Sequence, residues 1–165
     1  MIDISGFGAS ITVLAVQSFP VGFSLSQFAD DQDPLAVEDI EATAYEMLMD
    51  GSIFIFDKAV PVKLMVAVIP GSSDDINLKI LLQSRKGAAS IIPLPDVTSM
   101  VISYPDGGKV IFTNGSIIKG PLADSIQLSG RKKGNVYTFV FGSFSGAQSA
   151  KQVISGLVQT FTSLL

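Results

Sequence analysis

Apolar and polar residues alternate with a period of two along much of this 165-residue chain, and this alternation limits its fold most strongly. Successive side chains of a strand point to opposite faces, so each alternating run predicts a strand with one buried face. The clearest alternating runs cover residues 21–25, 62–68, 100–104 and 137–141. Further short strands are expected at residues 11–16, 41–49, 52–56 and 110–113. Turn sequences separate them at Asp50-Gly51, 105–108, Asn114-Gly115 and 133–135. About eight short strands with this spacing predict a mainly β fold, an antiparallel sandwich or barrel.

One helix is predicted inside this β pattern, at about residues 74–86. Ser72 and Asp75 have the spacing of a capping box, with Asp in the place of Glu. Gly87 can adopt the left-handed conformation that often ends a helix. A wide apolar stripe predicts that this helix flanks the sheet; it consists of Ile76, Leu78, Ile80, Leu81 and Leu82.

A second helix is predicted from Ala147 to about Leu164. Its apolar residues follow i, i+3, i+4 spacing, and its opposite face carries one charge, Lys151. This apolar face can pack on its own domain or on a neighbouring subunit, and a membrane-surface helix is disfavoured because basic residues are not clustered. The residues expected to be buried are Val153, Ile154, Leu157, Val158 and Phe161. The chain is thus expected to comprise a β domain over residues 1–144 and a C-terminal amphipathic helix within 145–165.

Charge is scarce and unevenly distributed. Charged residues make up 16% of the chain, compared with about 25% in a typical globular protein. Assembly with other chains would cover the surface that charge normally keeps soluble. Residues 1–57 hold ten acids and no base, whereas residues 58–165 hold all eleven bases and five acids. This division fits either a solvated surface or identical subunits that stack through complementary faces, and a pI near 4.6 opposes nucleic-acid binding.

The residue types exclude several chemistries. The chain has no His and no Cys, which excludes Ser-His-Asp and Cys-His nucleophiles, thiolate or imidazole metal sites, and disulfides. Gly6-Phe7-Gly8 lacks the third glycine of a dinucleotide-binding loop. The longest apolar run, 60–69, is too short to span a bilayer. We therefore predict no catalytic residue, no cofactor site, no membrane insertion and no enzymatic activity.

The densest acidic cluster is Asp30, Asp31 and Asp33, just before Pro34. Three carboxylates this close could bind Ca²⁺ or Mg²⁺, but the spacing does not match an EF-hand loop. A solvated loop or a protein interface is the preferred interpretation, and no metal site is predicted.

Three segments resemble small tail proteins of contractile-tailed bacteriophages. They are Phe19–Pro34, Val68–Leu82 and the stretch from Asn114–Gly120 through Gly130-Arg131 to Tyr137–Phe141. These motifs are short and rich in turn residues, and together they span most of residues 1–144.

The resemblance implies an antiparallel β fold of the tail-tube type with one flanking helix. It also implies hexameric rings that stack into a conduit for DNA ejection, in the tail tube or in the baseplate next to it. The expected partners are further copies of the chain and other tail proteins of the sheath, baseplate and tube. DNA would pass through without specific binding, repelled by acidic residues in the lumen. The protein would be made in the cytoplasm of the bacterial host and reside in the virion.

Two segments are expected to join stacked rings through complementary charge. They are the acidic cluster Asp30, Asp31 and Asp33, and the basic triplet Arg131, Lys132 and Lys133. Two other functions remain open: a small-ligand-binding β-barrel module, and a metal-dependent hydrolase that uses the acidic cluster.

Overall fold

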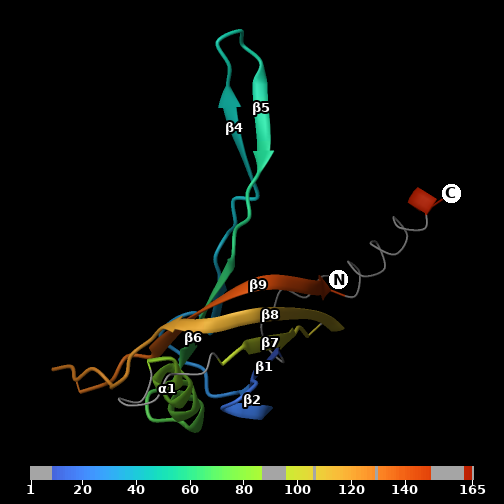
Figure 1. Cartoon of the computed structure of the whole chain (residues 1–165). Helices are drawn as coiled ribbons and strands as arrows, with labels where there is room; N and C mark the ends of the chain where they lie inside the picture. Colours follow the sequence, from blue (N-terminus) through green and yellow to red (C-terminus); the bar gives the residue numbers. More distant parts are fainter. Residues whose placement is uncertain (1–8, 87–95, 106, 129, 150–161, 165) are drawn as a thin grey trace.

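The computed structural model describes residues 9–86, 96–105, 107–128, 130–149 and 162–164. Seven strands form one curved antiparallel sheet in the order β2-β1-β7-β8-β9-β6-β3, and two further strands form a hairpin that projects from it (Figure 1). The sheet strands are β1 (Ser10–Ala15), β2 (Phe19–Leu25), β3 (Leu35–Val37), β6 (Val62–Val68), β7 (Thr98–Ser103), β8 (Gly107–Lys119) and β9 (Asn135–Ser149). The hairpin consists of β4 (Thr43–Met47) and β5 (Ile53–Asp57), and α1 (Ser73–Lys86) lies against the sheet. The prediction of a mainly β, antiparallel fold with one flanking helix is confirmed.

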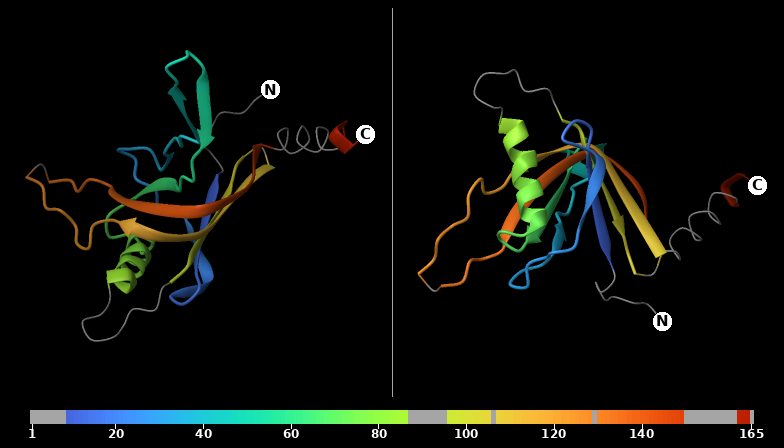
Figure 2. Two further views of the ribbon diagram at one scale, coloured as in Figure 1. Left: turned by 45° about the horizontal axis from the view of Figure 1, so that its top comes forward. Right: turned by 90° about the horizontal axis from the view of Figure 1, so that it is seen from below.

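The core lies between the inner face of the sheet and α1 (Figure 2). Alternate residues of each long strand point inward, which is the outcome that the period-two pattern predicted. Each fully buried apolar side chain stabilises the fold by about 1.5–3 kcal/mol. The largest buried side chains are Tyr137, Phe139 and Phe141 on β9, Leu64 on β6, Leu78 and Leu81 on α1, and Met100 and Ile102 on β7.

Helix α1 begins and ends close to the predicted positions, and half of the capping box is present. The Asp75 N–H donates to Oγ of Ser72 over 3.2 Å, as expected for a helix N-cap. The Asp75 carboxylate does not return to the Ser72 N–H; it accepts from the Gly71 N–H over 3.0 Å. No helix in the described part of the chain is long and apolar enough to cross a membrane.

Asn114-Gly115 is a bulge inside β8, so the predicted turn at this position is wrong. Asn114 has a φ of 57°, and the register between β7 and β8 shifts between the pairs Thr98–Gly115 and Met100–Phe112. The left-handed conformation that suits Asn in a hairpin turn also suits the extra residue of a bulge. β8 therefore continues through residues that a turn would have separated.

β9 extends further than the sequence indicated. Its residues 143–149 pair with the first half of β8, so the boundary expected at residues 144/145 and the helix expected from Ala147 are both wrong. The helix was predicted to start too early because small residues such as Gly146 and Ala147 are compatible both with a long twisted strand and with the start of a helix. Residues 162–164 are helical. The predicted apolar face, Val153, Ile154, Leu157, Val158 and Phe161, lies outside the described residues.

Candidate functional site

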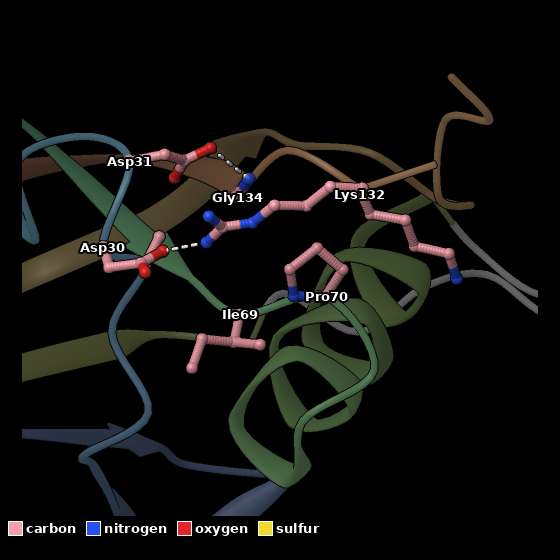
Figure 3. A pocket seen from close by; sticks show the side chains of 8 residues that line it. Asp30, Asp31, Ile69, Pro70, Lys132 and Gly134 are labelled. Carbon is pink, nitrogen blue, oxygen red and sulfur yellow. Dashed lines mark hydrogen bonds and ion pairs between the residues drawn. The ribbon is translucent and has the colours of Figure 1, made fainter. Parts of the chain in front are cut away.

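Two loops that are far apart in the sequence lie side by side in the structure. The acidic loop, residues 29–34, follows β2, and the basic loop, residues 120–134, connects β8 to β9. The Arg131 guanidinium donates to Asp30, the Gly134 N–H donates to Asp31 over 3.0 Å, and the Gln32 side-chain amide donates to the Gly134 carbonyl over 2.9 Å. In Figure 3, Asp30 and Asp31 face the basic loop and Lys132 points away from them. The two segments that were expected to join neighbouring rings thus contact each other within one chain.

Gly134 allows this close approach. A Cβ at this position would lie 2.5 Å from the Cβ of Ala29 and 2.8 Å from Oδ1 of Asp31. The Asp30–Arg131 pair itself is about 70% exposed on both sides, and such pairs contribute about 0–1 kcal/mol. Asp33 and Lys133 are exposed and have no side-chain partner among the described residues.

A polar network anchors the basic loop to α1 and β9. Lys79 on α1 lies between the Asp75 and Asp124 carboxylates, at 2.9 and 2.5 Å. The Asn135 amide also donates to both carboxylates, over 2.9 and 2.8 Å. The Tyr137 hydroxyl donates to Oδ1 of Asp75 over 2.7 Å. This network fixes the start of β9 and the end of the basic loop relative to α1.

The network shifts the pKa values of its members. Burial raises the pKa of Asp75, but hydrogen bonds from Asn135, Tyr137, Lys79 and the Gly71 N–H outweigh it and leave the pKa below its ordinary value. Hydrogen bonds from Lys79 and Asn135, and one from the exposed Lys132, lower the pKa of Asp124. Burial lowers the pKa of Lys79, but the Asp124 and Asp75 carboxylates outweigh this effect and leave the pKa above its ordinary value. The charged carboxylates and the charged lysine are therefore the forms that the fold stabilises.

The β4–β5 hairpin exposes many of its apolar side chains. It projects away from the sheet on the side opposite α1 (Figure 1). A surface of this kind marks contact with other proteins. The exposed apolar residues on and beside the hairpin are Ile40, Tyr45, Met47, Leu48, Met49, Ile53, Phe54, Ile55 and Phe56.

The sequence analysis missed this surface, although a signal was present. The strand Ile53–Phe56 is a continuous apolar run, which is typical of a strand covered on both faces. In the structure neither face of this strand is covered by the described residues. Both faces are therefore open to contact with another molecule.

The sheet has two open edges, β2 and β3. Its outer face carries mostly small, hydroxylated or aliphatic side chains, with Lys63 and Lys109 as exposed charges. Carboxylates are concentrated on the hairpin and the loops instead.

The acidic cluster does not form a metal site in the described structure. Among the described residues, no three His, Cys, Asp or Glu side chains are placed to hold one ion. Asp30 and Asp31 contact Arg131 and Gly134 of the same chain instead.

The β-rich fold of this chain is similar to the folds of two solved chains from contractile injection systems. A sheath/tube terminator of an extracellular contractile injection system (PVC) has a TM-score of 0.55 at 11% identity, over 88% of this chain and 97% of that chain. A chain of the anti-feeding prophage baseplate has a TM-score of 0.55 at 9% identity, over 91% of this chain and 99% of that chain. No curated protein matches the sequence.

A family model described as tail fiber protein gp32 matches residues 2–145, and the chain belongs to this family. It is therefore a phage-type tail protein, a structural component of a virion or a phage-like particle. The resemblance to tail proteins that the sequence motifs indicated is confirmed at this level.

Proposed function

We propose that this tail protein is a ring-forming subunit of the tail tube or of the tube-proximal baseplate, and that its rings line the conduit for DNA ejection. The family match carries the proposal, because residues 2–145 include nearly all of the β domain. The surfaces support it, since two open sheet edges and an uncovered hairpin leave the monomer incomplete. The role is mechanical, and the expected partners are copies of the chain and other tail proteins.

Edge pairing is the simplest way to close a ring. β2 at one edge offers unpaired backbone groups along Phe19–Leu25, and β3 at the other edge offers three residues. Pairing of the β2 edge of one subunit with the β3 edge of the next would continue one sheet around the ring and remove edges that otherwise aggregate.

The outer face of the sheet would then face the lumen. It presents Ser and Thr with Lys63 and Lys109, not the acidic side chains expected from the resemblance. Repulsion of DNA phosphates would have to come from carboxylates on the loops at the rim of each ring.

Stacking of rings through the acidic and basic loops remains a proposal, and Asp33 and Lys133 test it best. Neither side chain has a partner in the part of the chain that the structure describes, so Asp33→Lys and Lys133→Glu leave the Asp30–Arg131 contact intact. Each reversal should weaken stacking, and the combination should restore it, with the effect declining as salt shortens the Debye length below about 8 Å. If the combination restores nothing, the two loops do not face each other across rings.

Sedimentation and virion labelling test the function itself. The expected result is a closed oligomer at tens of micromolar and an antibody label on the tail tube or baseplate. A monomer in solution, together with absence of the protein from purified particles, would overturn the proposal. A monomer that binds an apolar ligand would instead favour the small-ligand module.

A further inference from the structure

We infer that the tip of the β4–β5 hairpin, residues 47–53, docks in a groove between α1 and the end of β8 on a second copy of this chain. The inference rests on the proposed function, because it names the contact by which one subunit recognises the next.

The hairpin tip is a preformed apolar knob. The Leu48 N–H donates to the Ser52 carbonyl over 2.9 Å, and the Gly51 N–H donates to the Leu48 carbonyl over 3.0 Å. Gly51 has a φ of 85°, which favours glycine, and Asp50 accepts from the Ser52 N–H over 2.9 Å. These bonds fix the backbone, so little conformational entropy is lost when the tip binds.

The side chains of the tip suit an irregular apolar groove. Met49 is fully exposed, and Met47 and Leu48 are at least half-exposed. Methionine is flexible and polarisable, and it fills uneven apolar gaps well. Such a tip gains most by insertion into a concave surface, since a flat surface would cover only part of it.

A concave surface of the right character is present on the same chain. A groove of about 540 Å³ is lined by Leu82 and Arg85 of α1, by Ile118 and Lys119 at the end of β8, and by Leu122. Ile118 is 53% exposed and Leu122 is 41% exposed, so the groove offers apolar surface that the chain itself does not cover. Its volume lies within the roughly 300–1,000 Å³ of pockets that enclose apolar ligands.

The charges of tip and groove are opposite. Glu46 and Asp50 flank the apolar side chains of the tip, and Arg85 and Lys119 flank those of the groove. Among the described residues, Glu46, Arg85 and Lys119 have no ion-pair partner. The groove has no carboxylate among its lining residues. Complementary charge of this kind selects a partner and its orientation.

The hairpin cannot fill the groove of its own chain. It projects from the sheet on the side opposite α1 (Figures 1 and 2), and α1 provides Leu82 and Arg85 of the groove. A tip-in-groove contact therefore joins two copies. In the arrangement that we propose it is heterologous, so each subunit inserts its tip into one neighbour and accepts the tip of another. Repeated contacts of this kind close into a ring if the rotation between subunits permits, and otherwise extend into a filament.

The chain has no cysteine, so any disulfide that forms in a cysteine variant must join the introduced residues, and disulfide trapping can test this contact. One chain carries both Met49→Cys and Ile118→Cys, and a matched chain carries Val21→Cys and Ile118→Cys, because Val21 is 92% exposed at the β2 edge. Under mild oxidation we expect the first chain to form a ladder of covalent oligomers at least about tenfold faster than the second, since docked residues react at a high effective concentration. The single variants should remain largely monomeric over the same time.

Each other outcome counts against the inference. If the unmodified protein sediments as an oligomer but the two double variants cross-link equally, the groove is not the docking site, while ring formation stands. Dimers of the single Met49→Cys variant alone would show that tips meet tips. A protein that remains monomeric would overturn both this contact and the proposed function.

Discussion

Removal of the Tyr137 hydroxyl tests the polar network most directly. The side chain is fully buried and donates to Oδ1 of Asp75 over 2.7 Å. Tyr137→Phe keeps the ring and deletes the donor, so the buried carboxylate loses one of the groups that compensate for its burial. Hydrogen bonds to charged groups contribute about 1.5–3 kcal/mol, and we expect the free energy of unfolding at neutral pH to fall by about this amount.

The pH dependence separates this mechanism from a packing defect. The pKa of Asp75 lies below its ordinary value of 3.8, so its contribution to stability is present above that value and is lost as the pH falls through the folded-state pKa. The difference between the parent protein and Tyr137→Phe should therefore be constant near neutral pH and shrink below about pH 4. Burial and the Asp75 contact raise the pKa of Tyr137, so its phenol stays protonated throughout this range.

Urea unfolding, followed by far-UV circular dichroism at a series of pH values, gives the free-energy difference between the two proteins and its dependence on pH. Tyr104→Phe is the matched control, because Tyr104 is partly buried at the edge of the core and has no side-chain hydrogen bond among the described residues. This control should change stability by less than about 0.5 kcal/mol at any pH. Equal losses in the two variants, or a loss for Tyr137→Phe that persists unchanged in acid, would refute the reasoning.

Three further changes test other parts of the molecule. Lys79→Met leaves its two carboxylate partners without their shared cation, and it should lower the free energy of unfolding in urea by about 3 kcal/mol. Lys132→Ala is the control: because the Lys132 side chain is exposed, this change should lower the free energy of unfolding by less than about 1 kcal/mol. Because its pKa is raised, the contribution of Lys79 should also be lost as the pH rises above 10.5. Gly115→Ala should lower the free energy of unfolding by about 1–3 kcal/mol in calorimetry, because the added Cβ would lie 2.2 Å from a phenylalanine ring of β9. Gly142→Ala is the control and should be tolerated, because the nearest atoms to a Cβ at that position lie 3.5 Å away. Leu157→Asp in the predicted C-terminal helix should cost several kcal/mol of folding or assembly, and a variant that assembles and melts like the parent would show that the apolar face is exposed.

The period of the apolar pattern was enough to predict most of the fold. It identified β6, β7 and the inner face of β9, because each of these strands buries one face and exposes the other. It missed β3, since three residues are too few for a period to appear. It misplaced the end of β9. The long pairing with β8 holds residues 143–149 in a strand, and this outweighs the weak local conformational preference of a Gly- and Ser-rich segment.

The candidate surfaces were only partly predictable. The Asp75–Lys79 pair is visible in the sequence as an i, i+4 pair on a helix. Asp124 and Asn135 could not be assigned to the same network, since they are brought to α1 by the basic loop and by the start of β9. Similarly, the sequence showed that the Asp30 and Arg131 segments are complementary but not that they meet within one chain.

Contacts inside the chain explain only part of its charge segregation. Three exposed or half-exposed carboxylates form ion pairs: Glu41 with Lys58, Asp30 with Arg131, and Asp124 with Lys79 and Lys132. Most of the exposed charges that remain unpaired among the described residues are still separated. The acids lie on the acidic loop and on or beside the hairpin, as Asp33, Glu38, Asp39, Glu46 and Asp57. The bases Arg85, Lys119 and Lys133 lie on α1, at the end of β8 and on the basic loop, and Lys109 lies on the outer face of the sheet. Lys63 is the exception, because it lies beside Glu38 and Asp39. A monomer gains nothing from this separation, because opposite charges held far apart are screened by salt. Subunits that meet head to tail gain from it at every contact, and this favours a heterologous arrangement over one in which like surfaces meet.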